Sequence, residues 1–135
     1  MITISKAYSF DSAHQLWRDD WSRDKNVEVF GKCSTVHGHT YRLEVYISGD
    51  VDPASGMVLN YFLLDETVKP LVERLDHKFL NDIFNNLTTS ENMVADIAEW
   101  VNTALAQRYA LSVSQVTLQE TPKTKAVWVP ERTHL

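Results

Sequence analysis

One stretch of the chain, Cys33-Ser34-Thr35-Val36-His37-Gly38-His39-Thr40-Tyr41, combines a thiol with two closely spaced histidines. Beyond it, apolar and mostly polar side chains alternate up to about Ser48. This period of two predicts a β-strand over 37–48, with one face toward the core. His37 and His39 share the parity of the apolar positions, so we expect both imidazoles on the inward face.

Two histidines at i and i+2 of a strand can hold one metal ion, because neutral imidazole is a good ligand for zinc and similar ions. A catalytic zinc usually takes three protein ligands, and His14, just after a strand predicted over 2–10, is the candidate third. The alternative is that His37 and His39 are ordinary strand-end histidines bonded to backbone. A third interpretation makes Cys33 the fourth ligand of a closed structural zinc site.

Composition narrows the class of protein. A chain of 135 residues is one domain, over 1–135, and is long enough to bury a real core. The net charge of −5 argues against a general nucleic-acid binder. The chain has one cysteine and therefore no intrachain disulfide, which fits a reducing compartment. No apolar run is long enough to span a membrane and no signal-peptide pattern opens the chain, so we expect a cytoplasmic protein.

The remaining patterns predict an α+β fold. Residues 15–30 lack a clean period and are interpreted as a surface excursion. We expect a turn over 49–56 and a third strand over 57–61 that pairs back as a hairpin. A helix follows over 64–75, which Pro70 kinks or divides, and a second helix runs from a Thr88/Glu91 capping box to about 109. Two further strands are expected over 116–121 and 126–129. The prediction is an antiparallel sheet of four or five strands with both helices on one face. Oligomerisation is one way to cover the other face and the edges.

Two further sites carry ionisable groups. Asp76 and His77 bring a carboxylate and an imidazole together after a predicted helix, although a polar helix end would explain them equally. Glu120 has the parity of the core residues Val116 and Leu118. It is either a strand end that already reaches solvent or a carboxylate at the floor of a pocket, where it would receive donors from a ligand.

Six motifs in this order resemble the 6-pyruvoyl-tetrahydropterin synthase family, which includes the 6-carboxy-tetrahydropterin synthases of queuosine biosynthesis. They are Phe10-Asp11-Ser12-Ala13-His14, Cys33-x-x-x-His37-Gly38-His39, Gly56-Met57-Val58, Leu75-Asp76-His77-x-x-Leu80-Asn81, Thr89-Ser90-Glu91-Asn92 and Glu120-Thr121. Each motif alone is weak, but together they cover nearly the whole chain. The resemblance implies the tunnelling fold, in which subunit sheets join into a barrel and two trimeric rings stack as a homohexamer.

The resemblance also implies a substrate, 7,8-dihydroneopterin triphosphate, in a site between subunits. His14, His37 and His39 would bind Zn²⁺, which would polarise the substrate's side-chain hydroxyls. Cys33 would transfer protons as a thiolate, and Asp76 with His77 of a neighbouring subunit would form a second proton-transfer pair. Glu120 would accept hydrogen bonds from the pterin ring, and Thr89, Ser90 and Glu91 would line the pterin pocket.

The expected product is 6-carboxy-5,6,7,8-tetrahydropterin, formed with release of acetaldehyde and triphosphate, because the Cys33-x-x-x-His37 spacing is similar to the carboxy branch. The alternative is 6-pyruvoyl-tetrahydropterin, because the segments 30–33 and 56–60 and the long 14–33 interval are closer to the pyruvoyl branch. A non-catalytic zinc- or pterin-binding module is the competing class, but it would have no need for Cys33 or for the Asp76–His77 pair.

Overall fold

The central strand of the fold is β2 (His37–Gly49), where the alternating pattern lies. The computed structural model describes residues 1–131 and places β2 in an antiparallel sheet of order β1-β2-β3-β4. The other strands are β1 (Ile2–His14), β3 (Val113–Thr121) and β4 (Thr124–Trp128). The predicted domain over 1–135 therefore includes four residues that lie outside the described range.

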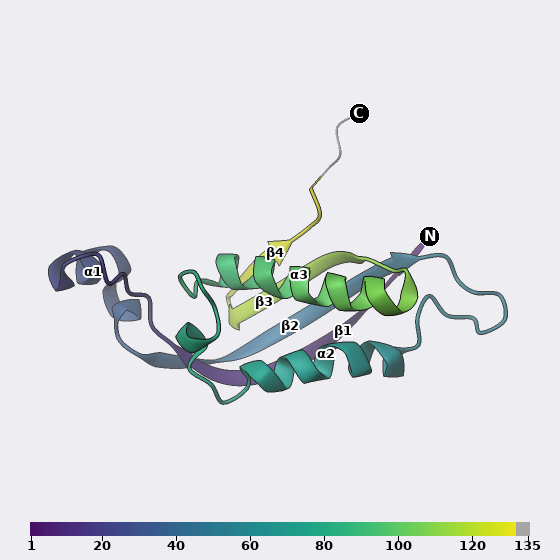
Figure 1. Cartoon of the computed structure of the whole chain (residues 1–135), viewed down its shortest axis with the longest axis horizontal. Coiled ribbons are helices and arrows are strands. Elements are labelled where there is room, and N and C mark those ends of the chain that lie inside the picture. Colours follow the sequence, from purple (N-terminus) through teal and green to yellow (C-terminus); the bar gives the residue numbers. More distant parts are fainter. Residues whose placement is uncertain (132–135) are drawn as a thin grey trace.

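Two helices cover one face of this sheet (Figure 1), as the α+β prediction required. They are α2 (Tyr61–Leu75) and α3 (Ser90–Tyr109). Their apolar stripes pack against the inward face of the strands, where Tyr41, Leu43, Val45 and Ile47 of β2 are completely buried. Burying side chains of this size contributes about 1.5–3 kcal/mol each, so β2 anchors the core. None of the helices within residues 1–131 has the length and apolar character that a membrane crossing requires.

The region between β2 and α2 differs from the prediction. The expected third strand over 57–61 is wrong, because these residues make a turn and the start of a helix. Asp52 O accepts the amide of Gly56, and the Asn60 side chain caps α2 by accepting from the Phe62 amide at 2.9 Å. Pro70 lies inside α2 without dividing it.

The start of α3 also needs a correction. The cap is Thr89, whose hydroxyl accepts from the Asn92 amide at 3.2 Å, and not Thr88. Thr88 is instead completely buried. The predicted Thr88/Glu91 capping box is therefore wrong, because the cap lies one residue later and the Glu91 carboxylate accepts from Ser90 instead. The Thr88 backbone and hydroxyl are left for contacts near the end of β1.

Residues 15–36 form an arm that leaves the sheet at the end of β1 and returns at the start of β2. The prediction of an irregular excursion is wrong in part, since the arm contains α1 (Arg23–Phe30) and the short 3-10 helix η1 (Gly31–Ser34). The buried Asn26 side chain bonds to the backbone of residues 18–22, and Trp21 stacks on Phe30 at a centroid distance of 5.7 Å. Figure 1 shows α1 projecting beyond one end of the sheet.

Candidate active site

Three histidines meet where β1 ends and β2 begins. β1 extends four residues further than predicted, so His14 lies opposite His37 in the strand register. His39 follows two residues later on the same face, and the three ring centroids are 4.5 to 5.2 Å apart. The antiparallel pairing thus brings together residues that are more than twenty positions apart in the chain.

Backbone carbonyls orient two of these rings. His14 Nδ1 lies 2.8 Å from the Thr88 carbonyl oxygen, and His37 Nδ1 lies 2.7 Å from that of Thr35. A carbonyl only accepts, so Nδ1 carries the proton in both rings and Nε2 is left as the metal-binding atom. The Nε2 atoms of His14, His37 and His39 are all buried, and none of them makes a hydrogen bond of good geometry. A buried nitrogen without a hydrogen bond is energetically unfavourable unless a bound ligand interacts with it.

Glu120 of β3 completes the group. Its Oε1 lies 3.1 Å from His14 Nε2 and 3.0 Å from His39 Nε2, and one ligand atom from each of the four residues lies within 4.8 Å of the others. The adjacent His14 ring holds the pKa of Glu120 below its usual range, and burial lowers the pKa of His39. Three imidazole nitrogens beside a carboxylate are a donor set that suits zinc.

Cys33 lies in η1, on the arm, and is half-buried. It does not belong to the group of gathered ligand atoms, which among residues 1–131 consists of the three histidines and Glu120. The interpretation of Cys33 as a fourth ligand therefore receives no support from the geometry.

Asp76 and His77 follow α2 and run along the outer edge of β1. The Asp76 carboxylate lies 2.8 Å from His77 Nδ1 and also accepts the Asp11 amide at 2.9 Å. These contacts, the Asp11 amide first, hold the pKa of Asp76 below its usual range. His77 donates its own amide to Asp11 O at 2.6 Å, and its side chain is 78% exposed.

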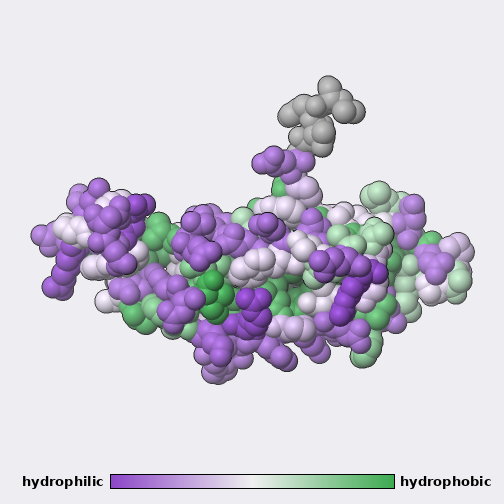
Figure 2. Space-filling view, viewed as in Figure 1, coloured by the Kyte–Doolittle hydropathy of each residue, from purple (hydrophilic) through white to green (hydrophobic). Residues whose placement is uncertain are grey.

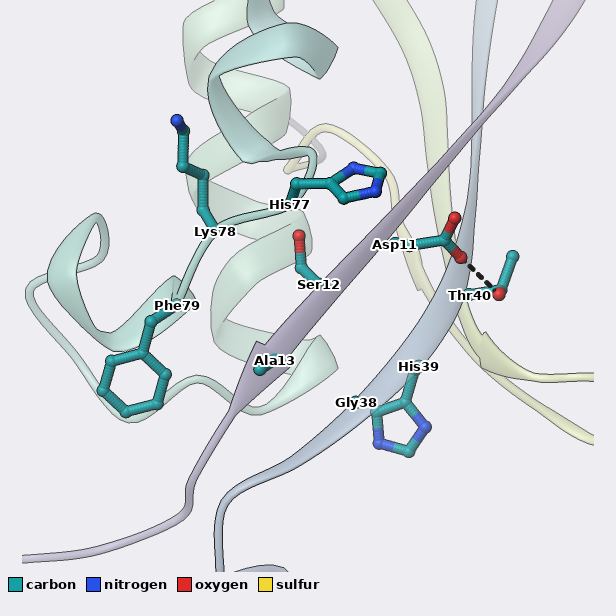
Figure 3. Close-up of a pocket in the computed structure, with 9 residues that line it drawn as sticks. All are labelled: Asp11, Ser12, Ala13, Gly38, His39, Thr40, His77, Lys78 and Phe79. Atoms are coloured by element: carbon teal, nitrogen blue, oxygen red, sulfur yellow. Dashed lines mark hydrogen bonds between the residues drawn. The ribbon is translucent and has the colours of Figure 1, made fainter.

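A cavity of about 600 Å³ joins this edge to the start of β2. Figure 3 shows the His77 and His39 rings on opposite sides of β1, with Asp11 accepting a hydrogen bond from Thr40 between the strands. Within one chain, His77 and His39 thus line the same cavity, with the β1 backbone between their rings.

The predicted pterin-lining residues occupy the first turn of α3. Thr89 caps the helix, and Ser90 donates a hydrogen bond to the Glu91 carboxylate at 2.8 Å. They directly follow Thr88, whose carbonyl orients His14, so this turn adjoins the histidine group.

Sequence reasoning missed two members of the site. Thr88 was interpreted only as part of a capping box, and no local pattern reveals its contact with His14. Tyr41 lies on the apolar face of the predicted strand, yet its buried hydroxyl has no hydrogen-bond partner, and its ring packs against those of His14 and His39. Its parity with His37 and His39 was the available signal. Burial, with the nearby charge of Glu120, raises the pKa of the Tyr41 hydroxyl.

The chain is similar to known proteins along nearly its whole length. The sequence profile described as 6-pyruvoyl tetrahydropterin synthase matches residues 3–131. A 6-pyruvoyl tetrahydrobiopterin synthase of Drosophila melanogaster is 35% identical over 89% of this chain and 74% of its own length. The structure of Caenorhabditis elegans 6-pyruvoyl tetrahydropterin synthase matches with a TM-score of 0.87 and 31% identity, covering 96% of each chain.

The expected carboxy product is contradicted by these relatives. An Aquifex aeolicus 6-carboxy-5,6,7,8-tetrahydropterin synthase is 29% identical over only 59% of this chain and 52% of its own length. The matches to the Drosophila and Caenorhabditis elegans pyruvoyl relatives have higher identity and cover a much larger share of both chains. The prediction gave too much weight to the short Cys33-x-x-x-His37 interval. The segments 30–33 and 56–60, which pointed the other way, end α1 and lead into the cap of α2. The assignment to queuosine biosynthesis depended on the carboxy product and is withdrawn with it.

Proposed function

The chain belongs to the 6-pyruvoyl tetrahydropterin synthase family, and we propose that it converts 7,8-dihydroneopterin triphosphate to 6-pyruvoyl-tetrahydropterin with elimination of triphosphate. The observation that carries the proposal is the set of three buried imidazole Nε2 atoms gathered with one carboxylate. The reaction needs no external oxidant, because the side chain is oxidised while the pterin ring is reduced. Protons move from side-chain carbons to the ring, and the C–O bond to triphosphate breaks.

His14, His37 and His39 would hold zinc in this proposal. The bound ion would act as a Lewis acid toward the hydroxyls of the substrate's side chain, which makes the neighbouring C–H protons more acidic. The Nδ1 contacts of His14 and His37 to backbone carbonyls keep both rings in the tautomer that such binding requires.

Cys33 would remove or return one of these protons as a thiolate. The Asp76–His77 pair would handle a second transfer, with the Asp76 carboxylate holding the His77 ring in one orientation and stabilising its protonated form. Triphosphate would then leave as the enol forms, without a base dedicated to that step.

Pterin recognition is assigned to Glu120 and to the first turn of α3. A carboxylate can accept two parallel hydrogen bonds from the amino group and ring N–H of a pterin, a flat donor pair. Glu120 lies beside His14 and His39, so a pterin held there would place its side chain toward the histidines. Thr89, Ser90 and Glu91 would line the same pocket. The zinc ligands, Cys33 and the pterin-binding residues would then all belong to one domain of one chain.

We extend the proposal to a homohexamer, a dimer of trimers, in which Asp76 and His77 of one subunit complete the site of another. Two features support it. The His77 side chain is mostly exposed, and Figure 3 shows the β1 backbone between the His77 and His39 rings of one chain. A catalytic histidine with so little cover is expected to be buried by a partner.

The experiment is product analysis by mass spectrometry after incubation of the zinc-loaded protein with 7,8-dihydroneopterin triphosphate. We expect 6-pyruvoyl-tetrahydropterin and one triphosphate per turnover, and neither with the Cys33→Ala variant as control. A 6-carboxy product with trapped acetaldehyde would contradict the proposed reaction. Absence of both products from the metal-loaded hexamer would favour a non-catalytic pterin-binding module.

A further inference from the structure

The neck of the arm is the short crossing where residues after β1 meet residues before β2. Two hydrogen bonds join its sides: the Leu16 amide donates to Cys33 O at 2.8 Å, and Gln15 Nε2 donates to Ser34 O at 2.7 Å. Both acceptors belong to η1, at Cys33 itself and at the residue after it. The neck therefore fixes the backbone that carries the chain's single thiol.

The backbone of Gln15 is held from the opposite side. Asn81 Oδ1 accepts the Gln15 amide at 2.9 Å, and Asn81 Nδ2 donates to the Gln15 carbonyl at 2.7 Å. The Thr88 hydroxyl lies 3.4 Å from the same carbonyl. Gln15 thus connects η1 to the segment between α2 and α3, which also carries His77 and the Thr88 carbonyl that orients His14.

The helix α1 does little to tie η1 to the sheet. α1 packs mainly against η1 rather than against the sheet. Its stabilising contacts, the Trp21–Phe30 stack and the Asn26 hydrogen bonds, stay within the arm. Figure 2 shows a mostly hydrophilic surface over the arm, as expected for a segment with a small apolar interior. The neck is therefore the link between η1 and the segment that follows β1.

We propose that Gln15 is a positioning residue for Cys33, and that Asn81 acts through it by fixing the Gln15 backbone. The inference rests on the proposed function in that Cys33 is taken as the proton-transferring thiol. The side-chain N–H of Gln15 is the essential group, because it is the donor to Ser34 O. Removing that donor should let η1 move, while His14 and His37 keep their own contacts to the Thr88 and Thr35 carbonyls.

Alkylation tests this directly, because Cys33 is the only cysteine and the rate of iodoacetamide reaction reports on it alone. In Gln15→Glu the donor is replaced by an acceptor of equal size. We expect faster alkylation of Cys33, faster hydrogen exchange at the Leu16 amide, and a roughly tenfold lower kcat with nearly unchanged KM. Zinc content should stay close to one per chain.

Two variants make the test specific. Gln15→Arg retains N–H donors of similar reach and should recover most of the slow alkylation and of kcat. Gln107→Glu makes the same change on the exposed surface of α3 and should behave like the unmodified protein. If Gln15→Glu leaves the alkylation rate and Leu16 exchange unchanged, the positioning inference is overturned.

Failure of the inference can be told apart from failure of the proposed function. An active Cys33→Ala protein would remove the thiol from the mechanism, whatever the alkylation rates of the Gln15 variants. Conversely, the Cys33→Ala protein could be inactive while the Gln15→Glu protein has a normal kcat. These two results together would keep the proposed chemistry and overturn the role of Gln15.

Discussion

The Asp76 carboxylate lies 2.8 Å from Nδ1 of His77, although the two residues are neighbours in the chain. Side chains of adjacent residues in regular structure point apart, and this pair meets because His77 has a left-handed backbone with φ of 56°. The Asp11 amide and carbonyl then hold both residues against β1. The geometry is that of a carboxylate orienting an imidazole.

Replacing Asp76 by Asn should therefore reduce kcat more than it raises KM. The amide cannot stabilise a protonated His77, and losses of roughly 10²-fold are typical when one member of a proton-transfer pair is removed. Steady-state kinetics at saturating substrate measure the effect. Equal kcat values in Asp76→Asn and the unmodified protein would show that His77 needs no carboxylate.

His37→Ala should lose zinc. Removing one of three imidazole ligands leaves an incomplete site, and we expect bound zinc to fall at least about tenfold after dialysis against a weak chelator. Metal analysis by mass spectrometry gives the content directly. His77→Ala is the control and should keep its zinc, since that side chain is exposed and lies outside the ligand group. A His37→Ala protein with full zinc would reject the assigned ligand set.

Glu120→Ala should weaken substrate binding by roughly 2–5 kcal/mol if the carboxylate pairs with the pterin in a buried pocket. Isothermal titration with a non-hydrolysable substrate analogue measures the loss. Zinc should remain bound, because three histidines suffice for the ion. Loss of zinc with unchanged analogue affinity would make Glu120 a metal ligand rather than the pterin acceptor.

Mixing two inactive variants tests whether sites are shared between chains. Cys33→Ala and His77→Ala subunits, combined at random in equal amounts, should recover about one quarter of the normal activity, because that fraction of sites obtains both intact halves. Cys33→Ala mixed with His37→Ala is the matched control and should recover nothing, since both residues belong to the same half. No recovery in confirmed mixed hexamers would place the whole site within one chain.

Asp65 gives a prediction about stability and pH. It accepts hydrogen bonds from Lys6 at 2.6 Å and Tyr8 at 2.8 Å, and these contacts, Lys6 first, lower its pKa. A lowered folded-state pKa stabilises the fold fully above the unfolded value of about 3.9, and the contribution disappears as the pH falls through the folded value. Asp65→Asn should thus unfold at lower urea concentration at pH 7.

The difference between Asp65→Asn and the unmodified protein should shrink as the pH falls below about 4. Urea unfolding at several pH values follows this convergence, and Glu99→Gln on the exposed face of α3 controls for loss of a negative charge. A constant difference across the acid range would mean that the carboxylate charge is not what stabilises the contact.

The parts of the fold that sequence predicted well are those with a clear period. β2 and α3 alternate or repeat over many residues, and the inward parity of His37, His39 and Glu120 followed directly from it. The apolar run Met57-Val58-Leu59 was mistaken for a strand. Hydropathy alone does not reveal that Met57 O accepts the Asp52 amide within a turn rather than pairing with a strand.

The rest depended on contacts between distant residues. α1 has no apolar stripe from which it could be predicted. It is stabilised instead by the Asn26 hydrogen bonds and the Trp21–Phe30 stack within the arm. Thr88 orients His14 across 74 positions in the chain. Neither contact has a local signature, and both are needed to place the site's chemical groups.

The left-handed backbone of His77 lowers the stability of the fold but places a side chain that the proposed reaction needs. A side chain with a Cβ in this conformation is strained by about 1 kcal/mol relative to glycine. Selection of variants for heat resistance alone should therefore favour glycine at position 77, while selection for turnover should restore histidine. Under laboratory evolution, this residue would mark which of the two pressures the population has experienced.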